Sequence, residues 1–279
     1  MRAAFADAGV AAQVAQDGYA VVDLLGETEV RMLREMRTRT RGDLDGMPYS
    51  ATLMSRDPVY RRDVHAGIHE MIANPLRGLL PGHRLCHANF TIKRPHAPES
   101  AVPLHQDWSF VDEARHLALA VWCPLVDVAA GNGGLSVVPR SDRLNQQPRS
   151  TLLRFPYPDL TDLITRRYAV GQQLRSGQAV LFNTRLMHSS PPNLGDHERA
   201  AVAGLLVPDR TPLRLYYAAP ARPDVVRVFG VPDDFFLSYL LNAAPDPGLP
   251  QVDEFALRVD PVDLSRLARC LGGDDVAHR

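Results

Sequence analysis

From residue 85 onward the chain consists of short apolar segments separated by turn residues, and this alternation limits the fold more than any other feature. The segments are rich in Val, Leu and aromatic residues, which is typical of strands, and the turns include "GNGG" at 131–134 and "SSPPNLGD" at 189–196. Long helical patterns do not separate the segments, which argues against a parallel doubly wound sheet and for an antiparallel sandwich or barrel. The strand-like segments are "NFTIK" (89–93), "HLALAVWCPLV" (116–126), "LSVVP" (135–139), "QAVLFN" (178–183), "AAVAGLLV" (200–207), "LRLYY" (213–217) and "VVRVF" (225–229).

Helical patterns lie on both sides of this region. Before it, apolar residues recur at helical spacing between an N-cap at Asp57-Pro58 and a stop at Asn74-Pro75. Further helices are predicted at 27–39, 235–241 and 262–271, and a short strand at 19–23. Together the patterns predict a mainly β protein, a double-stranded β-helix (jelly roll, cupin-like) with flanking α-helices.

The chain is predicted to form one jelly-roll domain over residues 1–279. Residues 1–84 form a mainly helical N-terminal support, residues 85–230 the β core, and residues 231–279 the C-terminal helices. A chain of this length buries most of its apolar surface without the help of disulfide bonds. Its three cysteines are widely spaced, so we expect reduced thiols and a reducing compartment.

The overall charge and hydropathy exclude two classes of partner. With 31 basic and 32 acidic residues and no basic stripe, the chain has no field that would hold a nucleic acid. Its longest mostly apolar run, 117–126, is far shorter than the ~20 residues of a membrane helix. The N-terminus lacks the apolar region of a signal peptide, so we expect a cytoplasmic protein that binds a small molecule.

The stretch "LHQDW" at 104–108 carries a possible metal-binding pair, His105 and Asp107. On a strand, residues i and i+2 point to the same face with Cα atoms about 6.5–7 Å apart, so both side chains can reach one ion. The pair alone is more often two exposed polar groups. His188 adds a third ligand, because it ends a core-type strand and distant strands of a jelly roll meet at one mouth. Two imidazoles and one carboxylate form the facial triad that holds Fe(II).

Arg199 tests this interpretation independently. The turn at 189–198 makes the strands on either side plausible hairpin neighbours, which would bring Arg199 close to His188. A guanidinium offers a fixed fork for a carboxylate. A dicarboxylic keto acid can bind the metal at one end and this fork at the other, so the arginine is what 2-oxoglutarate requires.

These motifs resemble the phytanoyl-CoA dioxygenase family of Fe(II)/2-oxoglutarate-dependent oxygenases. That family's pattern runs HxD, NGxLxxxPGSH, H-x-S-x-x-N and then Arg about eleven residues after the second histidine; here the motifs are "LHQDW", "NGGLSVVPRSD", "MHSSPPN" and Arg199. The resemblance covers roughly residues 15–210, including "DGYAVVD". At 139–142 the chain has PRSD where the family has PGSH, so the identity of the substrate is not carried over.

The resemblance implies a role for each matched residue. It implies iron ligands at His105, Asp107 and His188, a 2-oxoglutarate clamp at Arg199, an assisting hydroxyl at Ser190, and cosubstrate-pocket residues at Lys93 and Trp122. Independently, Asn89, Thr91 and Lys93 alternate with apolar residues, so one polar strand face could point into the barrel. A solvated edge lysine at Lys93 and a core aromatic at Trp122 remain the alternatives.

The resemblance therefore implies an oxygenase that uses Fe(II), 2-oxoglutarate and O2 to hydroxylate an unactivated C–H bond, releasing succinate and CO2. The carboxylate of Asp107 favours hydroxylation, because halogenating relatives have a small residue in its place. The substrate class stays open among a small metabolite, an amino acid, and an intermediate tethered to a carrier protein or to CoA. Two alternatives are a non-oxidative divalent-metal cupin enzyme, which has no need of Arg199, and a non-catalytic jelly-roll binding protein, which has no need of an intact triad.

Overall fold

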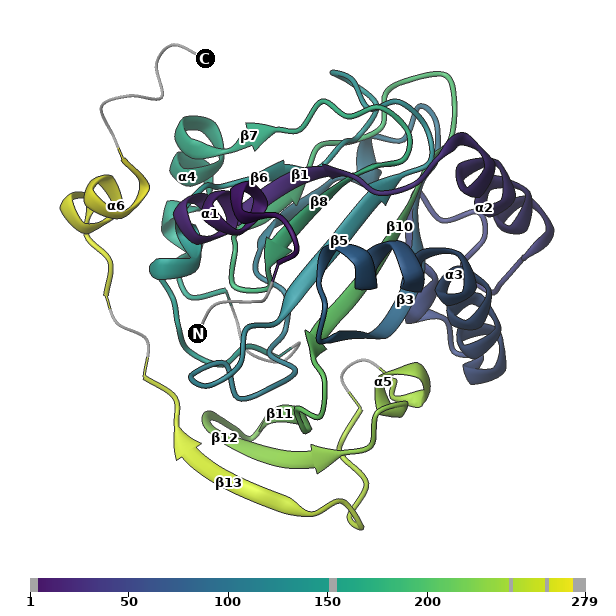
Figure 1. Cartoon of the computed structure of the whole chain (residues 1–279). Coiled ribbons are helices and arrows are strands. Elements are labelled where there is room, and N and C mark those ends of the chain that lie inside the picture. Colours follow the sequence, from purple (N-terminus) through teal and green to yellow (C-terminus); the bar gives the residue numbers. More distant parts are fainter. Residues whose placement is uncertain (1–4, 151–154, 241–242, 259–260, 273–279) are drawn as a thin grey trace.

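Two antiparallel sheets form the body of the protein, seen in a computed structural model that describes residues 5–150, 155–240, 243–258 and 261–272 (Figure 1). The larger sheet has the strand order β1-β8-β5-β10-β3-β2 and the smaller one β4-β9-β6-β7, which confirms the predicted mainly β jelly roll with flanking helices. The strands of the larger sheet are β1 (Tyr19–Asp23), β2 (Tyr49–Ala51), β3 (His83–Lys93), β5 (Leu119–Pro124), β8 (Gln178–Asn183) and β10 (Arg199–Pro208). Those of the smaller sheet are β4 (Val102–His105), β6 (Ser136–Val137), β7 (Val170–Gly171) and β9 (His188–Ser190).

Helices α1, α2 and α3 pack on the outer face of the larger sheet. The α-helices are α1 (Ala8–Asp17), α2 (Glu27–Arg39), α3 (Pro58–Leu79), α4 (Thr161–Tyr168), α5 (Phe235–Ser238) and α6 (Leu264–Leu271). The short 3-10 helices are η1 (Thr52–Met54), η2 (Pro98–Ser100), η3 (Ser141–Arg143) and η4 (Pro158–Leu160). Among the described residues, no helix combines the length and the apolar character needed to cross a bilayer.

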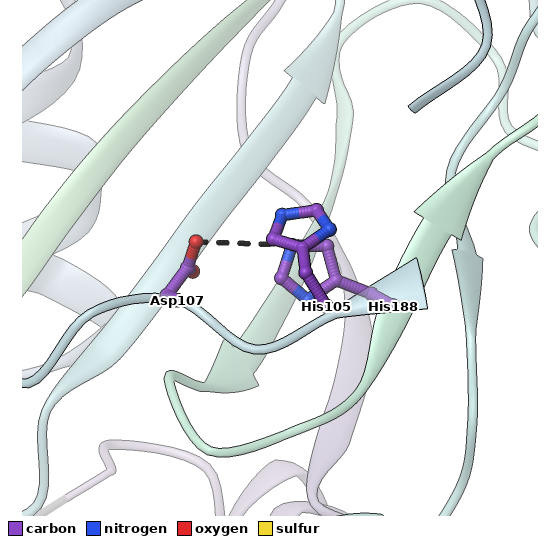
Figure 2. Close-up of side chains that lie close together, drawn as sticks. All are labelled: His105, Asp107 and His188. Atoms are coloured by element: carbon purple, nitrogen blue, oxygen red, sulfur yellow. Dashed lines mark ion pairs between the residues drawn. The ribbon is translucent and has the colours of Figure 1, made fainter. Parts of the chain in front are cut away.

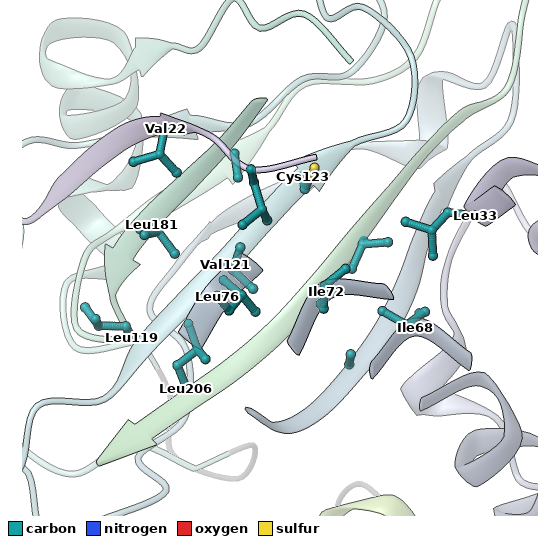
Figure 3. Close-up of a cluster of buried hydrophobic side chains, with 14 of the residues drawn as sticks. Val22, Leu33, Ile68, Ile72, Leu76, Leu119, Val121, Cys123, Leu181 and Leu206 are labelled. Atoms are coloured by element: carbon teal, nitrogen blue, oxygen red, sulfur yellow. The ribbon is translucent and has the colours of Figure 1, made fainter. Parts of the chain in front are cut away.

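The pleat of the larger sheet separates two apolar layers. On β5, Leu119 and Val121 face the helices and pack with Ile72 of α3 (Figure 3). The alternate residues of β5, including Trp122, face the smaller sheet and pack with Val137 of β6. Successive side chains of a strand point to opposite faces, so one layer of residues holds α3 on the sheet while the other lines the space between the two sheets.

Helix α3 continues past the proline at which the sequence predicts its end. Asp57 caps its first turn through Val59 N and Tyr60 N, as predicted, but the helix includes Pro75 and ends at Leu79. A proline inside a helix removes one backbone hydrogen bond. The buried Leu76 continues the apolar stripe beyond Pro75, so packing against the sheet holds the last turn and the predicted stop was wrong.

The strands on either side of the 189–198 turn are not hairpin neighbours, which corrects the expectation from the sequence. β9 pairs with β4 and β6 in the smaller sheet, whereas β10 pairs with β3 and β5 in the larger one. The turn therefore crosses from one sheet to the other. His188 also begins β9 and does not end β8 as expected.

A third sheet lies beside the two main ones. It has the order β11-β12-β13, with β11 at Leu213–Ala219, β12 at Arg222–Val231 and β13 at Gln251–Ala256. The sequence indicated the first two strands but not β13, because this strand is mostly exposed and carries no apolar alternation. The two C-terminal helices are shorter than predicted, and residue 241 of the first lies outside the described residues.

Candidate metal centre

His105, Asp107 and His188 lie together between the two sheets (Figure 2). One ligand atom from each lies within 4.8 Å of the others, and His188 Nε2 is 3.8 Å from Asp107 Oδ1. The imidazole centroids of the two histidines are 4.2 Å apart, because His105 and His188 face each other across the β4-β9 pair. β4 ends at His105, so Asp107 reaches the group from the following loop and not from the strand face that its spacing suggested.

Both imidazoles are oriented by backbone carbonyls. His105 Nδ1 lies 2.8 Å from Pro103 O and His188 Nδ1 lies 2.9 Å from Leu186 O. A proton on each Nδ1 leaves each Nε2 with a free lone pair, as metal-binding histidines require. Burial and then the neighbouring imidazole of His188 lower the pKa of His105 to about 4, although Asp107 acts in the opposite direction, so this ring is neutral near pH 7. Two imidazoles and a carboxylate are a donor set that fits Fe(II).

A pair of arginines braces the loop that carries Asp107. Arg149 Nε donates to Asp107 O at 2.7 Å, and the Arg149 guanidinium also forms two hydrogen bonds with Glu113 at 2.6 and 2.8 Å. Arg185 donates to the same carboxylate at 3.2 Å. The Glu113 side chain is 7% exposed, and burial raises its pKa, but the two arginines outweigh burial and hold the pKa below its ordinary value. Asp107 is therefore held by an ionised buried network.

The three residues line a cavity of about 290 Å³ between the sheets. Its volume is at the lower end of the range for small-molecule pockets. Its wall is mostly apolar and aromatic, and most of its polar side chains come from β3, β9, β10 and residues 105–107. The remaining polar and aromatic lining residues include Tyr49, His87, Asn89, Thr91, Gln106, Trp108, Phe110, Trp122, Phe182, Ser190 and Arg199.

Arg199 is a buried cation that forms no ion pair with the residues that the structure describes. It is 2% exposed, and its Nη1 donates to Thr91 O at 3.0 Å, while its Nε has no partner among the described residues. Its guanidinium carbon lies 5.4 Å from the centroid of Trp122. Burial lowers the pKa of Arg199 to about 10, which leaves it charged near neutral pH. A buried charge needs a partner of opposite sign, so the unused side of the fork fits the carboxylate of a ligand.

Ser190 lines the cavity, whereas Lys93 does not. Lys93 is 0% exposed, so it is not a solvated edge lysine, but it is absent from the cavity lining and its Nζ donates to Ser190 O at 3.0 Å and to Pro191 O. Burial and then Arg199 lower its pKa to about 7. Ser190 does line the cavity, with its hydroxyl donating to Gly133 O at 2.8 Å. A Cβ on Gly133, which has φ +76°, would meet the Lys93 side chain at 2.7 Å, so this turn requires glycine.

Tyr49 and His87 line the cavity, although the sequence did not identify either as a site residue. Tyr49 lies opposite Lys93 in the β2-β3 pair, where burial raises its pKa, and no local pattern signals it. His87 lies two residues before Asn89 on the cavity side of β3. The polar alternation of Asn89 and Thr91, extended backwards by one step, would have identified it.

The chain matches the model of a known family, described as "Phytanoyl-CoA dioxygenase (PhyH)", over residues 5–201. None of the curated proteins matches its sequence. Solved structures share its fold. HygX from Streptomyces hygroscopicus, crystallised with nickel, 2-oxoglutarate and hygromycin B, is 18% identical over 73% of this chain and 88% of its own, with a TM-score of 0.53. SnoN, a non-heme α-ketoglutarate-dependent epimerase from nogalamycin biosynthesis, is 21% identical over 90% of this chain and 95% of its own, with a TM-score of 0.53.

Proposed function

The chain belongs to the phytanoyl-CoA dioxygenase family, and we propose that its cavity is the active site of a hydroxylase that acts on an unactivated C–H bond of a small molecule. Its enzyme class is the Fe(II)- and 2-oxoglutarate-dependent oxygenases, with O2 as oxidant. One observation carries the proposal. The only permanent cation in the described cavity lining is Arg199, and it shares that cavity with two imidazoles and a carboxylate whose donor atoms converge.

We propose that His105, Asp107 and His188 hold Fe(II). Their converging donor atoms and the two Nδ1 contacts to backbone carbonyls support this assignment. When bound, iron and 2-oxoglutarate supply the oxidising power, since reduction of O2 is coupled to decarboxylation of 2-oxoglutarate to succinate and CO2. The carboxylate of Asp107 occupies a position that halogenating relatives leave open, and this supports hydroxylation as the reaction.

We propose that Arg199 binds the far carboxylate of 2-oxoglutarate. Thr91 fixes one end of the guanidinium and the Trp122 ring covers one side, so the cation is positioned before the ligand arrives. Ser190 lines the same part of the cavity and its hydroxyl can turn from Gly133 O to the ligand. Lys93 instead holds the 190–191 backbone that forms this end of the wall.

The remaining wall residues position the substrate and exclude water. The volume of about 290 Å³ supports a small substrate, since a carrier or CoA group could place only its acyl end inside. We also propose that the described elements act as one domain. The Arg61 guanidinium of α3 donates to Ser238 O of α5 at 2.7 Å, and Arg140 donates to Leu271 O of α6 at 2.8 Å, so both C-terminal helices are tied to the body.

The proposal is tested by succinate formation. Purified protein with Fe(II), 2-oxoglutarate and O2 should form succinate slowly without substrate and faster when a suitable substrate is added. Omitting iron or O2, or changing Asp107 to Ala, should remove this reaction. Succinate formation that persists in the Asp107→Ala protein would contradict the proposed centre, and stimulation of a non-oxidative reaction by Zn(II) would favour the divalent-metal alternative.

A further inference from the structure

Two polar side chains on β3 face the cavity with atoms that have no hydrogen-bond partner among the described residues. Both ring nitrogens of His87 and the Oδ1 of Asn89 lack a hydrogen bond. The two side chains are 7% and 6% exposed and both line the cavity. Buried polar groups in native proteins are nearly always hydrogen-bonded, so two adjacent exceptions aimed into one cavity indicate that a ligand completes them.

His87 lies beyond the reach of a cosubstrate held at Arg199, and the unpaired atom of Asn89 does not suit that cosubstrate. In the β3-β10 pair, Arg199 lies opposite Lys93, whereas His87 lies opposite Leu205, six residues along the strand. Six residues of strand span about 20 Å, which is much longer than a five-carbon diacid. The amide of Asn89 donates to Ala203 O at 3.3 Å, which leaves its Oδ1 as an acceptor unsuited to a carboxylate. Both groups are therefore available to the oxidised substrate.

The hydrogen-bonding capacity of this pair defines the ligand group. Burial and then His65 lower the pKa of His87 to about 4, although the charge of Asp107 opposes them, so the imidazole is neutral. A neutral imidazole offers one donor and one acceptor, and Asn89 Oδ1 offers one acceptor. A hydroxyl group both donates and accepts, whereas a carboxylate cannot donate and an ammonium cannot accept.

The surroundings of His87 are aromatic and carry no free cation. Its ring centroid lies 5.6 Å from that of Phe110, which in turn lies 6.0 Å from Trp108. Of the lining residues that the structure describes, Arg199 alone has a permanent positive charge, and 2-oxoglutarate would occupy it. A substrate for this end of the cavity therefore needs an apolar body for the aromatic wall and a neutral polar group for His87.

We infer that His87 and Asn89 form the recognition subsite for a hydroxyl group of a neutral substrate whose apolar body lies against Phe110 and Trp108. This inference rests on the proposed function for its identification of the cavity as the active site. It narrows the substrate from any small molecule to an alcohol, phenol or polyol with an apolar face, and it disfavours free amino acids and substrates whose buried end is charged.

The two tryptophans of the chain allow a direct test, because both line the cavity. Trp108 lies near Phe110 and His87, whereas Trp122 lies beside Arg199. Tryptophan fluorescence therefore reports ligands in this cavity. A Trp122→Phe protein keeps the reporter at the proposed hydroxyl subsite, and a Trp108→Phe protein keeps the reporter at the Arg199 end.

Four probes that share a phenyl ring separate neutral hydroxyl, apolar, cationic and anionic ligands: benzyl alcohol, toluene, benzylammonium and benzoate. They are titrated anaerobically into protein loaded with Fe(II) and 2-oxoglutarate, and again into protein with the metal chelated. Benzyl alcohol should bind more tightly than toluene and should change the emission of the Trp122→Phe protein. His87→Leu and Asn89→Leu should each weaken benzyl alcohol about fivefold, the value of one neutral hydrogen bond, and leave toluene unchanged.

A matched control is present on the same strand. His83 is also a buried histidine of β3, but it does not line the cavity. His83→Leu should leave all four affinities unchanged, and His87→Gln, which keeps a donor and an acceptor, should retain the preference for benzyl alcohol. His87→Leu should not lower the free energy of unfolding, because it removes unpaired buried polar atoms.

The inference is overturned if benzyl alcohol binds no better than toluene, or if His83→Leu weakens it as much as His87→Leu does. It is also overturned if benzoate or benzylammonium binds more tightly than benzyl alcohol and loses that affinity in His87→Leu. Failure of the proposed function has a different signature. In that case 2-oxoglutarate does not bind with Fe(II), while the preference for benzyl alcohol in the metal-free protein still depends on His87.

Discussion

The guanidinium carbon of Arg199 lies 5.4 Å from the ring centroid of Trp122, and both side chains line the cavity that holds the three candidate ligands. Thr91 O accepts from one nitrogen of the fork, and the aromatic face stabilises the cation. The arginine is thus fixed in position, and no anion among the described residues pairs with it. A cavity with such a cation at one end and unpaired neutral groups at the other is suited to two different ligands.

Arg199→Ala should weaken 2-oxoglutarate by about tenfold to a hundredfold, because a charge-assisted contact contributes about 1.5–3 kcal/mol. Arg199→Lys keeps the charge without the fork and should weaken it less. Neither change should remove iron. Anaerobic titration of 2-oxoglutarate into Fe(II)-loaded protein, followed by the metal-to-ligand absorption band, measures this effect. Arg175→Ala, at an exposed arginine, is the control, and an unchanged affinity in Arg199→Ala would remove Arg199 from the cosubstrate site.

His188→Ala should lose Fe(II) binding while the protein stays folded, because only one imidazole and one carboxylate remain. Metal content after dialysis and the circular dichroism spectrum measure the two properties. His96→Ala, at an exposed histidine away from the cavity, should bind one Fe(II) per chain like the parent. Full iron content in His188→Ala would exclude His188 as a ligand.

Asp107→Gly should abolish hydroxylation, because it removes the only carboxylate of the triad. The vacated position should bind chloride, which a chloride-dependent shift of the metal-to-ligand band would report. Chlorine transfer need not follow, since it also depends on how the substrate is held. Chlorination of substrate by the unchanged protein is the result that would contradict the assignment as a hydroxylase.

The sequence predicted the jelly roll and the cluster of candidate ligands, but the strand pairing that brings the site residues together differs from the expected one. His188 and Arg199 were expected to meet as hairpin neighbours, but they belong to two sheets and line the same cavity from opposite sides. Strand pairing depends on contacts far apart in sequence, and a turn motif alone does not show whether the chain returns to the same sheet.

The surroundings of the site could not be read from local patterns. The bond from Arg149 to Asp107 joins residues 42 positions apart, and the Arg149–Glu113 pair joins residues 36 positions apart. In the sequence no local pattern distinguishes these charged residues from the others. His87 is different, because its alternation with Asn89 is visible in the sequence. The predicted polar strand face began at Asn89 and was therefore one step too short.

Arg140 accounts for one departure from the family pattern. It occupies the place of the family's glycine with φ +66°, the left-handed conformation that glycine adopts most readily, and it donates to Leu271 O at 2.8 Å. Arg140→Gly should relieve the backbone strain but release α6, so hydrogen exchange in residues 264–271 should become faster while iron and 2-oxoglutarate still bind. Arg269→Ala, on the exposed side of α6, is the control, and unchanged exchange in Arg140→Gly would show that the contact does not hold the helix.

Glu113→Gln should destabilise the protein by about 3–5 kcal/mol, because it leaves the buried guanidinium of Arg149 and the half-buried one of Arg185 without their shared carboxylate. It should also weaken Fe(II) binding about tenfold, since Arg149 orients the backbone at Asp107.

The pKa of Glu113 is below its ordinary value of 4.5 in the folded protein. The stabilisation that this carboxylate contributes is therefore fully present above pH 4.5 and is lost as the pH falls through the lower pKa of the folded state. Urea unfolding at a series of pH values should therefore show a steeper acid loss in the parent than in Glu113→Gln. Glu99→Gln, at an exposed glutamate, should follow the parent, and parallel curves for the parent and Glu113→Gln would mean that this carboxylate does not stabilise the loop as an anion.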